Sequence, residues 1–247
     1  METKCDVVET DINTLPVADP VAFEAEHVHR VYDAIAHHFS STRYKAWPKV
    51  RSFVEGLQKG SFLVDVGCGN GKNLCLSNHV WSVGCDRSSK LIHIAAGQRL
   101  EGLISDALRV PFQSNSFDAV LSIAVVHHFT TVERRSSAIT ELLRLVKPSS
   151  GLVLIYVWAK EQPRERGAGS DVLIKWEMHN VFDISESVYH RYYHLFSKGE
   201  LEQLCSGVTL NGYEVKIEDS YYDKENWCVV LSKQEKKSFN PPTTNTS

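Results

Sequence analysis

Residues 61–73 read SFLVDVGCGNGKN, an apolar run that ends in an acid and is followed by three closely spaced glycines. The run at 62–66 predicts a buried strand, because about four to eight consecutive apolar, β-rich residues bounded by turn formers suit a strand packed on both faces. Gly67, Gly69 and Gly71 predict a tight turn, since glycine accepts positive φ and lets another molecule approach the backbone. The stretch therefore predicts a ligand lying against the main chain.

A second acid supports a nucleotide-like ligand. Residues 81–86 (WSVGCD) form another short apolar run, and it ends on an acid. Asp86 follows Asp65 by about 20 residues, the spacing at which a nucleotide-binding βαβ unit places a carboxylate on ribose hydroxyls. A dinucleotide fingerprint reads G-x-G-x-x-G, whereas this chain has G-C-G-N-G. If the glycines only made a tight turn, both well-placed acids would be unexplained.

This pattern of acid, glycine turn and second acid resembles the first motif of class I S-adenosylmethionine (SAM)-dependent methyltransferases. The resemblance implies an α/β fold with a Rossmann-like, seven-stranded, mostly parallel sheet and a terminal antiparallel hairpin. It also implies SAM as the cofactor, with the first acid and the glycines on its methionine end, the second acid on its ribose and a third acid on its adenine. The implied cofactor-binding residues are Asp65, Gly67, Gly69, Asn70, Gly71, Asp86, Asp106 and Ala107.

The composition is that of a soluble globule, with 43% hydrophobic and 23% charged residues in 247, a length that suits one decorated α/β domain. A net charge of −3 argues against coating nucleic acid by bulk electrostatics but leaves room for a local basic patch. The six cysteines have neither C-x-x-C nor zinc-type spacing, so no metal site or disulfide framework is predicted. Reduced thiols, with no signal pattern or long apolar run, predict a cytoplasmic protein, with the nucleus as a second location.

The chain divides into three parts. Residues 1–20 are acidic and aperiodic and predict a disordered N-terminus. Residues 21–234 predict the methyltransferase domain, and residues 235–247 predict a flexible polar tail. Within the domain, residues 160–181 hold a proline, glycines and two arginines, a composition that predicts a mobile basic insertion.

Periodicity and turn signals predict the elements of the domain. Segment 37–50 (HHFSSTRYKAWPKV) predicts a loop whose basic and aromatic side chains offer phosphate partners and stacking faces. The alternative, an amphipathic lid over the cofactor, is compatible with this. Helices are predicted at 21–39, 88–99, 133–146 and 197–205, and strands at 62–66, 81–86, 101–107, 117–125, 151–159, 213–222 and 227–233.

Several blocks resemble one family, the eukaryotic tRNA wobble-uridine methyltransferases that esterify 5-carboxymethyluridine. The resemblance implies a SAM-dependent enzyme that converts this nucleoside, in the anticodon loop of tRNA, into 5-methoxycarbonylmethyluridine. The chain departs from the family at Lys175-Trp176, where Pro-Trp is usual, and at 147–151, KPSSG in place of Lys-Pro-Gly-Gly. The resembling blocks are HHFSSTRYKAWP (37–48), DVGCGNGKN (65–73), SDALRVPFQSNSFDAVLSIAVVHHF (105–129), RRSSAITELLRLVKP (134–148), LIYVWAKEQ (154–162) and RYYHLFSKGELEQL (191–204).

Methyl transfer to a carboxylate needs no strong base, because a carboxyl group with a solution pKa of about 4 is already ionised at pH 7. The main requirement is to hold the reacting groups in line, and the planar fork of arginine grips a carboxylate or phosphate bidentately. Arg43 and Arg191 are therefore predicted to hold the substrate, and His128, after the fourth strand, to orient it. Further substrate contacts are predicted at Lys45, Trp47, Arg164, Arg166 and Tyr192.

Less specific interpretations stay open for these residues. His128 could simply cap its strand, Tyr192 could belong to the core, and Arg164 and Arg166 could form a solvated face. For the whole chain, the alternatives are a small-molecule methyltransferase of the same fold, acting on a quinone, sterol or metabolite, and a non-catalytic SAM-fold scaffold. The basic side chains argue against the first alternative, and the three acids argue against the second.

The family resemblance also implies a small zinc-binding activator subunit that docks on a sheet edge. In the class I strand order the third strand, residues 101–107, lies at an edge. It lacks the lysines and prolines that usually blunt an edge strand, so it is the predicted docking strand. The alternative is that the chain's own N-terminal residues cover this edge.

Overall fold

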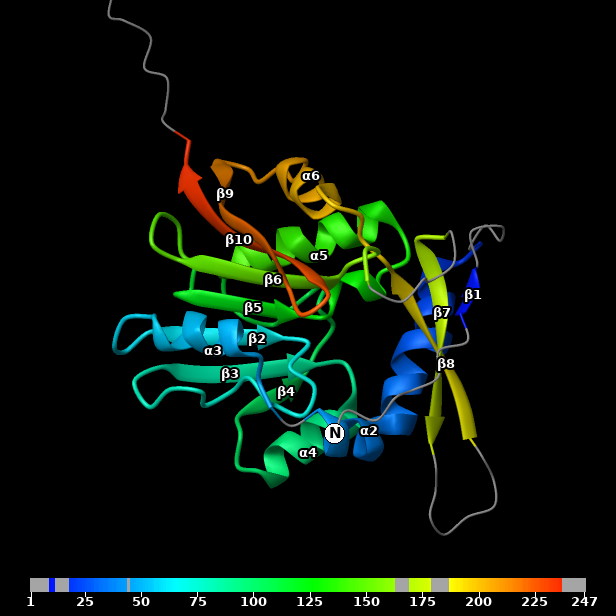
Figure 1. Cartoon of the computed structure of the whole chain (residues 1–247). Coiled ribbons are helices and arrows are strands. Elements are labelled where there is room, and N and C mark those ends of the chain that lie inside the picture. Colours follow the sequence, from blue (N-terminus) through cyan, green and yellow to red (C-terminus); the bar gives the residue numbers. More distant parts are fainter. Residues whose placement is uncertain (1–8, 12–17, 44, 163–168, 179–186, 237–247) are drawn as a thin grey trace, which may run out of the picture.

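The computed structural model describes the backbone of residues 9–11, 18–43, 45–162, 169–178 and 187–236 (Figure 1). These residues form a seven-stranded sheet, a separate three-stranded sheet and the helices around them. The strands are β1 (Glu9–Asp11), β2 (Phe62–Val66), β3 (Trp81–Asp86), β4 (Gly102–Ile104), β5 (Ala119–Ile123), β6 (Leu152–Trp158), β7 (Asp171–Met178), β8 (Ser187–His194), β9 (Tyr213–Asp223) and β10 (Asn226–Glu235). The helices are α1 (Pro20–Glu24), the π-helical η1 (Ala25–His29), α2 (Arg30–Thr42), α3 (Pro48–Glu55), α4 (Ser89–Gly97), the 3-10 turn η2 (Val126–His128), α5 (Val132–Leu145) and α6 (Glu200–Ser206).

The main sheet has the strand order β4-β3-β2-β5-β6-β10-β9. Neighbours from β4 to β6 are parallel, while β10 runs antiparallel to both β6 and β9. This is the predicted mostly parallel sheet with a terminal hairpin. From β2 the chain first adds β3 and β4 on one side and then β5 and β6 on the other, so the strand order reverses between β2 and β5. Ligands of open α/β sheets bind outside the carboxyl ends of the strands at such a switch point. The glycine turn follows β2 at this point.

Helices cover both faces of the main sheet (Figure 1). Because successive side chains of a strand point to opposite faces, neighbouring residues enter different cores. Val64 of β2 and Val120 of β5 pack with α5 and α6, whereas Leu63 and Leu121 pack with α3 on the other face. The strands are therefore buried on both sides, as the continuous apolar runs in the sequence predict.

The N-terminal helices lie between the main sheet and the small sheet β1-β7-β8 (Figure 1). Asp19 caps α1, because its side chain accepts hydrogen bonds from the backbone N–H groups of the first helical turn. On the side of the small sheet, Val28 packs against Tyr192 of β8, and Ile35 packs against Trp176 of β7. The small sheet thus positions α2 across the carboxyl ends of the main strands.

The structure differs from the sequence prediction at several places. No element was predicted at 187–194, which form β8, and the predicted loop at 37–50 is helical at both ends, where α2 ends and α3 begins. Residues 9–11, within the predicted disordered N-terminus, form β1, and residues 171–178, within the predicted mobile insertion, form β7. These strands pair with each other and with β8, and composition carries no record of a pairing partner so far along the chain. β4 is indeed an edge strand, but it spans only 102–104 of the predicted 101–107. Residues 163–168 and 237–247 lie outside the described segments.

None of the helices in the described segments is long and apolar enough to cross a bilayer. In the same segments, no three His, Cys, Asp or Glu side chains gather closely enough to hold a metal ion.

Candidate active site

The glycine turn after β2 is fixed by sterics. Gly67 and Gly71 both have φ of +81°, in the left-handed region that favours glycine. A Cβ added to Gly67 would lie 2.2 Å from Val125 Cγ2, and one added to Gly71 would lie 2.6 Å from Leu100 Cδ1. Gly69, with φ of +57°, has more room, since its Cβ would meet only Phe39 at 3.6 Å. The backbone at Gly69 is therefore the most open part of the turn.

Buried acceptors surround this turn. Asp65 is completely buried; its Oδ2 accepts a hydrogen bond of 3.2 Å from Asn73 Nδ2, and burial raises the pKa of its carboxyl to about 7. Among the described residues no donor reaches Asp65 Oδ1, Asn73 Oδ1 or Asn70 Oδ1. Buried polar atoms are normally paired, so these oxygens suit a ligand that brings hydrogen-bond donors or a positive charge.

Asp86, at the end of β3, ties the glycine turn to α4. Its Oδ2 accepts 2.8 Å from Gly69 N and its Oδ1 accepts 2.8 Å from Ser88 N. Burial raises the pKa of Asp86, and these two backbone donors oppose that rise. The hydroxyl of Ser88 in turn donates to Asp33 of α2 at 2.6 Å. The predicted ribose acid thus lies directly beside the predicted methionine-binding turn.

Asp106 follows β4 on the same edge of the sheet. Arg87, next to Asp86 in the chain, donates to Asp106 Oδ2 at 2.5 Å, and Leu108 N donates to Oδ1 at 2.9 Å. Both carboxylate oxygens already have a partner, so a ligand amino group would share one of them. Ala107 is half-buried and packs against the main core.

His128, in η2 after β5, is buried and hydrogen-bonded at both ring nitrogens. Its Nδ1 lies 2.8 Å from the carbonyl oxygen of Tyr192, and its Nε2 lies 3.0 Å from the hydroxyl of Tyr32. Burial, aided by the charge of Arg191, lowers its pKa to about 3, so the ring is neutral. A neutral, buried imidazole with both nitrogens engaged does not act as a base at pH 7.

Arg191, on β8, is 6% exposed and is enclosed by aromatic rings. Its guanidinium carbon lies 4.3 Å from the ring centroid of Trp176, 5.2 Å from that of Tyr193 and 5.9 Å from that of Tyr32. We call these four residues the arginine cage. Burial raises the pKa of Tyr193, and the charges of Arg191 and Arg43 both oppose that rise. Of the two predicted arginines, Arg191 thus lies against Tyr193, and Arg43 acts on it through its charge.

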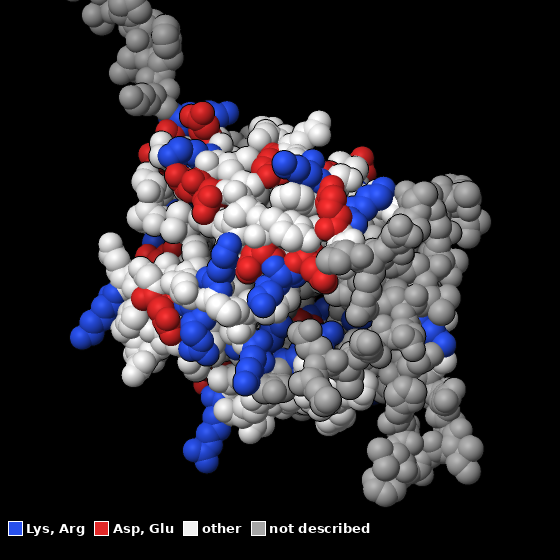
Figure 2. All heavy atoms as spheres, viewed as in Figure 1, with Lys and Arg blue, Asp and Glu red and all other residues white. Residues whose placement is uncertain are grey.

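Arg43 also touches the glycine turn, because its carbonyl oxygen accepts from Asn70 Nδ2 at 3.1 Å. Close by, the Lys72 ammonium lies 5.2 Å from the ring centroid of Trp47. The pKa of Lys72 is lowered, mainly by burial and also by the charge of Arg43, although the charge of Asp65 opposes this. Figure 2 shows Lys and Arg gathered on this face around α3. We define the basic patch as Arg43, Lys45, Lys49 and Lys72.

Aromatic rings underlie this patch. The ring of Trp47 packs against that of Tyr156 with centroids 5.4 Å apart and planes tilted by 33°, and the Lys49 ammonium lies 4.2 Å from the ring centroid of Tyr221. Lys45, on the short segment before α3, is exposed. The predicted combination of cations and stacking faces is therefore present next to the glycine turn.

Tyr192 does not occupy a substrate-facing position. Its side chain is 1% exposed, its ring packs on Phe23 of α1, and its hydroxyl donates to Asp171. Because side chains alternate along a strand, Arg191 and Tyr193 point to one face of β8 and Tyr192 points to the other, where it packs with Phe23 and Val28. Its contribution is the backbone carbonyl that holds His128. Arg164 and Arg166 lie outside the described residues.

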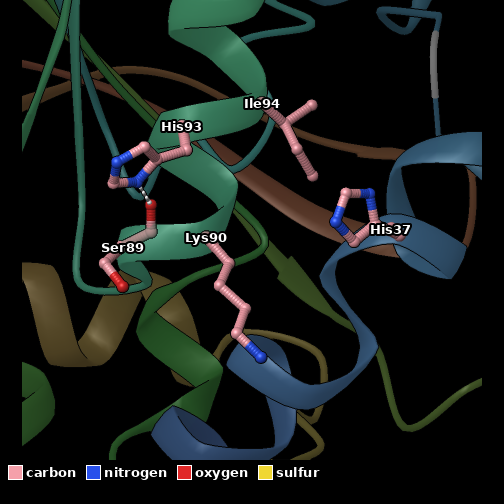
Figure 3. Close-up of a pocket in the computed structure, with 5 residues that line it drawn as sticks. All are labelled: His37, Ser89, Lys90, His93 and Ile94. Atoms are coloured by element: carbon pink, nitrogen blue, oxygen red, sulfur yellow. Dashed lines mark hydrogen bonds between the residues drawn. The ribbon is translucent and has the colours of Figure 1, made fainter.

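A cavity of about 440 Å³ opens beside the site, between α2 and α4. It is lined by His37, Ser89, Lys90, His93 and Ile94. Figure 3 shows Lys90 and Ile94 extending from α4 into the space before His37 of α2, whereas His93 turns to the Ser89 carbonyl, its Nδ1 donating at 2.6 Å. The cavity thus adds an exposed lysine to the same side of the molecule.

Comparison with known proteins identifies the family. Residues 64–154 match the methyltransferase domain family. A Schizosaccharomyces pombe protein named tRNA (carboxymethyluridine(34)-5-O)-methyltransferase is 43% identical over 233 residues, which cover 86% of this chain and 99% of that protein. The chain belongs to this tRNA carboxymethyluridine methyltransferase family. Its identity to a Xenopus tropicalis protein of the same name, over 85% of the chain, is 39%.

The tRNA carboxymethyluridine methyltransferases differ in length. The chain spans 41% of the Xenopus protein and 46% of the Macaca fascicularis one, but 81% of the Arabidopsis thaliana one. Solved structures show the fold alone. A Burkholderia thailandensis 1,6-didemethyltoxoflavin-N1-methyltransferase aligns with a TM-score of 0.65 at 16% identity, over 95% of this chain and 98% of its own. A Clostridium acetobutylicum SAM-dependent methyltransferase aligns with a TM-score of 0.61 at 12% identity, over 82% of this chain and 98% of its own. The class I fold predicted from the glycine turn is confirmed.

Four residues of the site were not predicted from the sequence. Asn73 and Lys72 follow the glycines directly, and the resembling stretch ends at Asn73, so its polar end was the available signal. Tyr32 carries no local motif, and Trp176 was noted only as part of Lys175-Trp176, where the chain departs from the family's Pro-Trp. Their positions depend on how α2 and β7 pack around β8, which only the structure shows.

Proposed function

We propose that this chain is a SAM-dependent methyltransferase that esterifies the carboxymethyl group of the wobble uridine in tRNA. One observation carries the proposal: Arg191 is buried in a cage of aromatic rings, and Arg43, whose charge also acts on Tyr193 of that cage, adjoins the glycine turn through its backbone carbonyl. A carboxylate held by arginine beside a methyl-donor site is what this reaction requires. The names of the family's curated members support the same conclusion.

The residues around the glycine turn fit the proposed cofactor. SAM carries an ammonium group, hydroxyls and an adenine amino group, all donors, and it supplies a methyl group on a positively charged sulfur when bound. The unpaired buried oxygens of Asp65, Asn70 and Asn73 would receive such donors. Asp86 would take the ribose hydroxyls, and Asp106 with Ala107 would border the adenine.

The arginine cage fits the proposed nucleophile. A carboxylate ionises with a pKa of about 4 and needs no base to activate it at pH 7, in agreement with a His128 that stays neutral. A guanidinium in a site of low dielectric binds a carboxylate far more strongly than one in water. Arg191 would hold the carboxylate, and Arg43 would hold a flanking phosphate or the second oxygen.

The basic patch fits a tRNA substrate. The chain as a whole is slightly acidic, so a group of cations beside the site, of which Arg43, Lys45 and Lys49 are exposed, is a local feature. Lysines and arginines bind phosphates without reading sequence, and rings such as Trp47 offer a face on which a base can stack. We place the protein in the cytoplasm, and also in the nucleus, where tRNA is found; imaging of the tagged protein tests this.

The edge strand β4 fits the proposed zinc-binding activator subunit. Among the described residues no strand pairs with its outer side, because β1 pairs with β7 instead. Ile104 is 56% exposed there. An unpaired edge with an exposed apolar residue favours strand addition by a partner. Co-expression with the activator is expected to raise solubility and activity; a fully active chain that gains nothing from the activator would contradict this proposal.

Nucleoside mass spectrometry tests the function in cells. Cells that lack the protein should accumulate 5-carboxymethyluridine in tRNA and lose 5-methoxycarbonylmethyluridine, and the wild-type gene should restore the ester. An unchanged ester level in the absence of the protein, in cells with no second enzyme of this family, would refute the proposed function.

A further inference from the structure

The hydrogen bonds of His128 have a fixed direction. The carbonyl oxygen of Tyr192 can only accept, so His128 Nδ1 carries the proton and donates over 2.8 Å. The ring is neutral, so its Nε2 carries no proton and must accept from the hydroxyl of Tyr32, 3.0 Å away. The Tyr32 hydroxyl proton is therefore committed to His128. The hydroxyl of Tyr193, 3.4 Å from that of Tyr32, then has only the role of donor.

Tyr32 lies between the two halves of the site. Its ring meets Phe39 edge-on, with centroids 5.5 Å apart, and Phe39 is the side chain nearest to the open backbone at Gly69. On its other side, the Arg191 guanidinium lies 5.9 Å from the Tyr32 ring. Tyr32 is half-buried, whereas His128 behind it is buried. A group bound by Arg191 on the side of Tyr32 would therefore reach Tyr32 before the buried His128.

The direction of the Tyr32 hydroxyl matters for a carboxylate nucleophile. The proposed reaction forms a bond from a carboxylate oxygen to the methyl carbon and breaks the bond from that carbon to sulfur, whose electron pair stays on sulfur; no proton is transferred. A hydroxyl that donates to the attacking oxygen would stabilise the bound carboxylate more than the transition state, in which that oxygen loses its charge. Such an interaction tightens substrate binding and slows the reaction.

We propose that His128 is a positioning residue that acts through Tyr32: by accepting the Tyr32 hydroxyl proton, it prevents this hydroxyl from donating to the carboxylate that Arg191 holds. The inference rests on the proposed function for the identity of the substrate. It assigns Tyr32 to the substrate side of the site and moves His128 one step away from the substrate.

A double-mutant cycle tests this role. His128→Asn can still donate to the Tyr192 carbonyl but has no acceptor near Tyr32, so the freed hydroxyl should turn to the substrate. We expect kcat and the KM for tRNA both to fall, kcat by about tenfold, the value of one ordinary hydrogen bond. Tyr32→Phe keeps the ring of the arginine cage and removes the hydroxyl, so adding His128→Asn to Tyr32→Phe should no longer lower kcat. If His128→Asn lowers kcat as much in the Tyr32→Phe protein as in the wild-type protein, or if it raises KM, the inference is overturned.

Two measurements separate this inference from folding defects and from the proposed function. SAM affinity by calorimetry should be unchanged in all three variants, as should the melting temperature within a few degrees. Nitrogen-15 NMR of the histidines in the wild-type protein should show His128 with its proton on Nδ1 and a bare Nε2. A proton on Nε2 would overturn the inference whatever the substrate is, whereas the proposed function fails on the nucleoside analysis alone.

Discussion

The two halves of the site are built in different ways. The cofactor half comes from one short stretch, residues 61–73, in which a strand, an acid and three glycines form a turn through local sterics. The substrate half is assembled from distant pieces: Tyr32 on α2, His128 after β5, Trp176 on β7 and Arg191 on β8. Local geometry fixes the first half, and long-range packing fixes the second.

This difference teaches where each function is encoded. A turn that only glycine can make is written into consecutive residues, so the cofactor half can be identified in any chain that carries it. The substrate half needs the small sheet β1-β7-β8 to hold Arg191 beside Tyr32. Changes on the small sheet should therefore alter methyl transfer and leave cofactor binding intact, and changes in the turn should do the reverse.

The largest expected effect comes from the arginine cage. Arg191→Ala should lower kcat/KM for tRNA by about 100-fold or more, since loss of a buried charge partner costs about 2–5 kcal/mol, with SAM affinity unchanged within about twofold. Arg191→Lys keeps the charge but loses the planar fork and should recover only part of the activity. The matched control is Arg30→Ala, an exposed arginine paired with Glu26. An equal fall in SAM affinity would place Arg191 in the cofactor half.

The next effect concerns the glycine turn. Gly69→Val should weaken SAM binding by about tenfold or more, because a branched residue at φ of +57° costs about 1–3 kcal/mol and its side chain enters the ligand's approach. Gly60→Val is the control, since Gly60 also has positive φ but lies in open space before β2. Calorimetry measures both. Unchanged affinity in Gly69→Val would refute the assignment of the turn.

Much of the cofactor half could be predicted from the sequence, and little of the substrate half. Asp65, the glycines and Asp86 were identified because strand, turn and acid follow one another in a known spacing. Arg191 was predicted to hold the substrate because of its planar fork, and the structure places it among aromatic rings. Tyr192 was assigned to the substrate because β8 was not predicted as a strand. Had residues 187–194 been read with the period of two, Arg191 and Tyr193 would share a face and Tyr192 would be on the other.

A smaller effect should come from the basic patch. Arg43→Ala should raise the KM for tRNA about three- to tenfold and reduce the salt dependence of binding by about one ion, as expected for one lost phosphate contact. SAM affinity should stay the same. Lys59→Ala is the control, because Lys59 is exposed in the turn before β2, at the opposite ends of the strands. If both variants behave alike, the patch does not bind RNA.

The smallest effect concerns the anchoring of β8. His194 Nδ1 lies 2.9 Å from Asp171 and its Nε2 lies 2.6 Å from Glu200. Burial lowers the pKa of His194, but the hydrogen bonds to the two carboxylates outweigh burial, so its pKa is raised. Burial raises the pKa values of Asp171 and Glu200, but their hydrogen bonds, including those to His194, outweigh it, so both pKa values are lowered.

The sign of the pH dependence follows from these shifts. The histidine contribution is complete below its unfolded pKa of about 6.5 and is lost as the pH rises through the raised folded value. The carboxylate contribution is complete above about pH 4.5 and is lost in acid. His194→Gln should therefore cost about 1 kcal/mol in denaturant unfolding at pH 5.5 and less at pH 9. His37→Gln changes an exposed histidine and is the control. If His194→Gln lost the same free energy of unfolding at pH 5.5 and at pH 9, the assigned role of His194 would be contradicted.

Methyl transfer in a purified system tests the division of the site most directly. The protein, co-expressed with the proposed activator, is incubated with SAM and either tRNA that carries 5-carboxymethyluridine or the same tRNA with unmodified uridine. The nucleosides are then analysed by mass spectrometry. We expect 5-methoxycarbonylmethyluridine from the first tRNA, no methylation of the second, and loss of the product with Arg191→Ala despite normal SAM binding. Equal methylation of both tRNAs, or a fully active Arg191→Ala, would show that the arginine cage does not hold the substrate carboxylate.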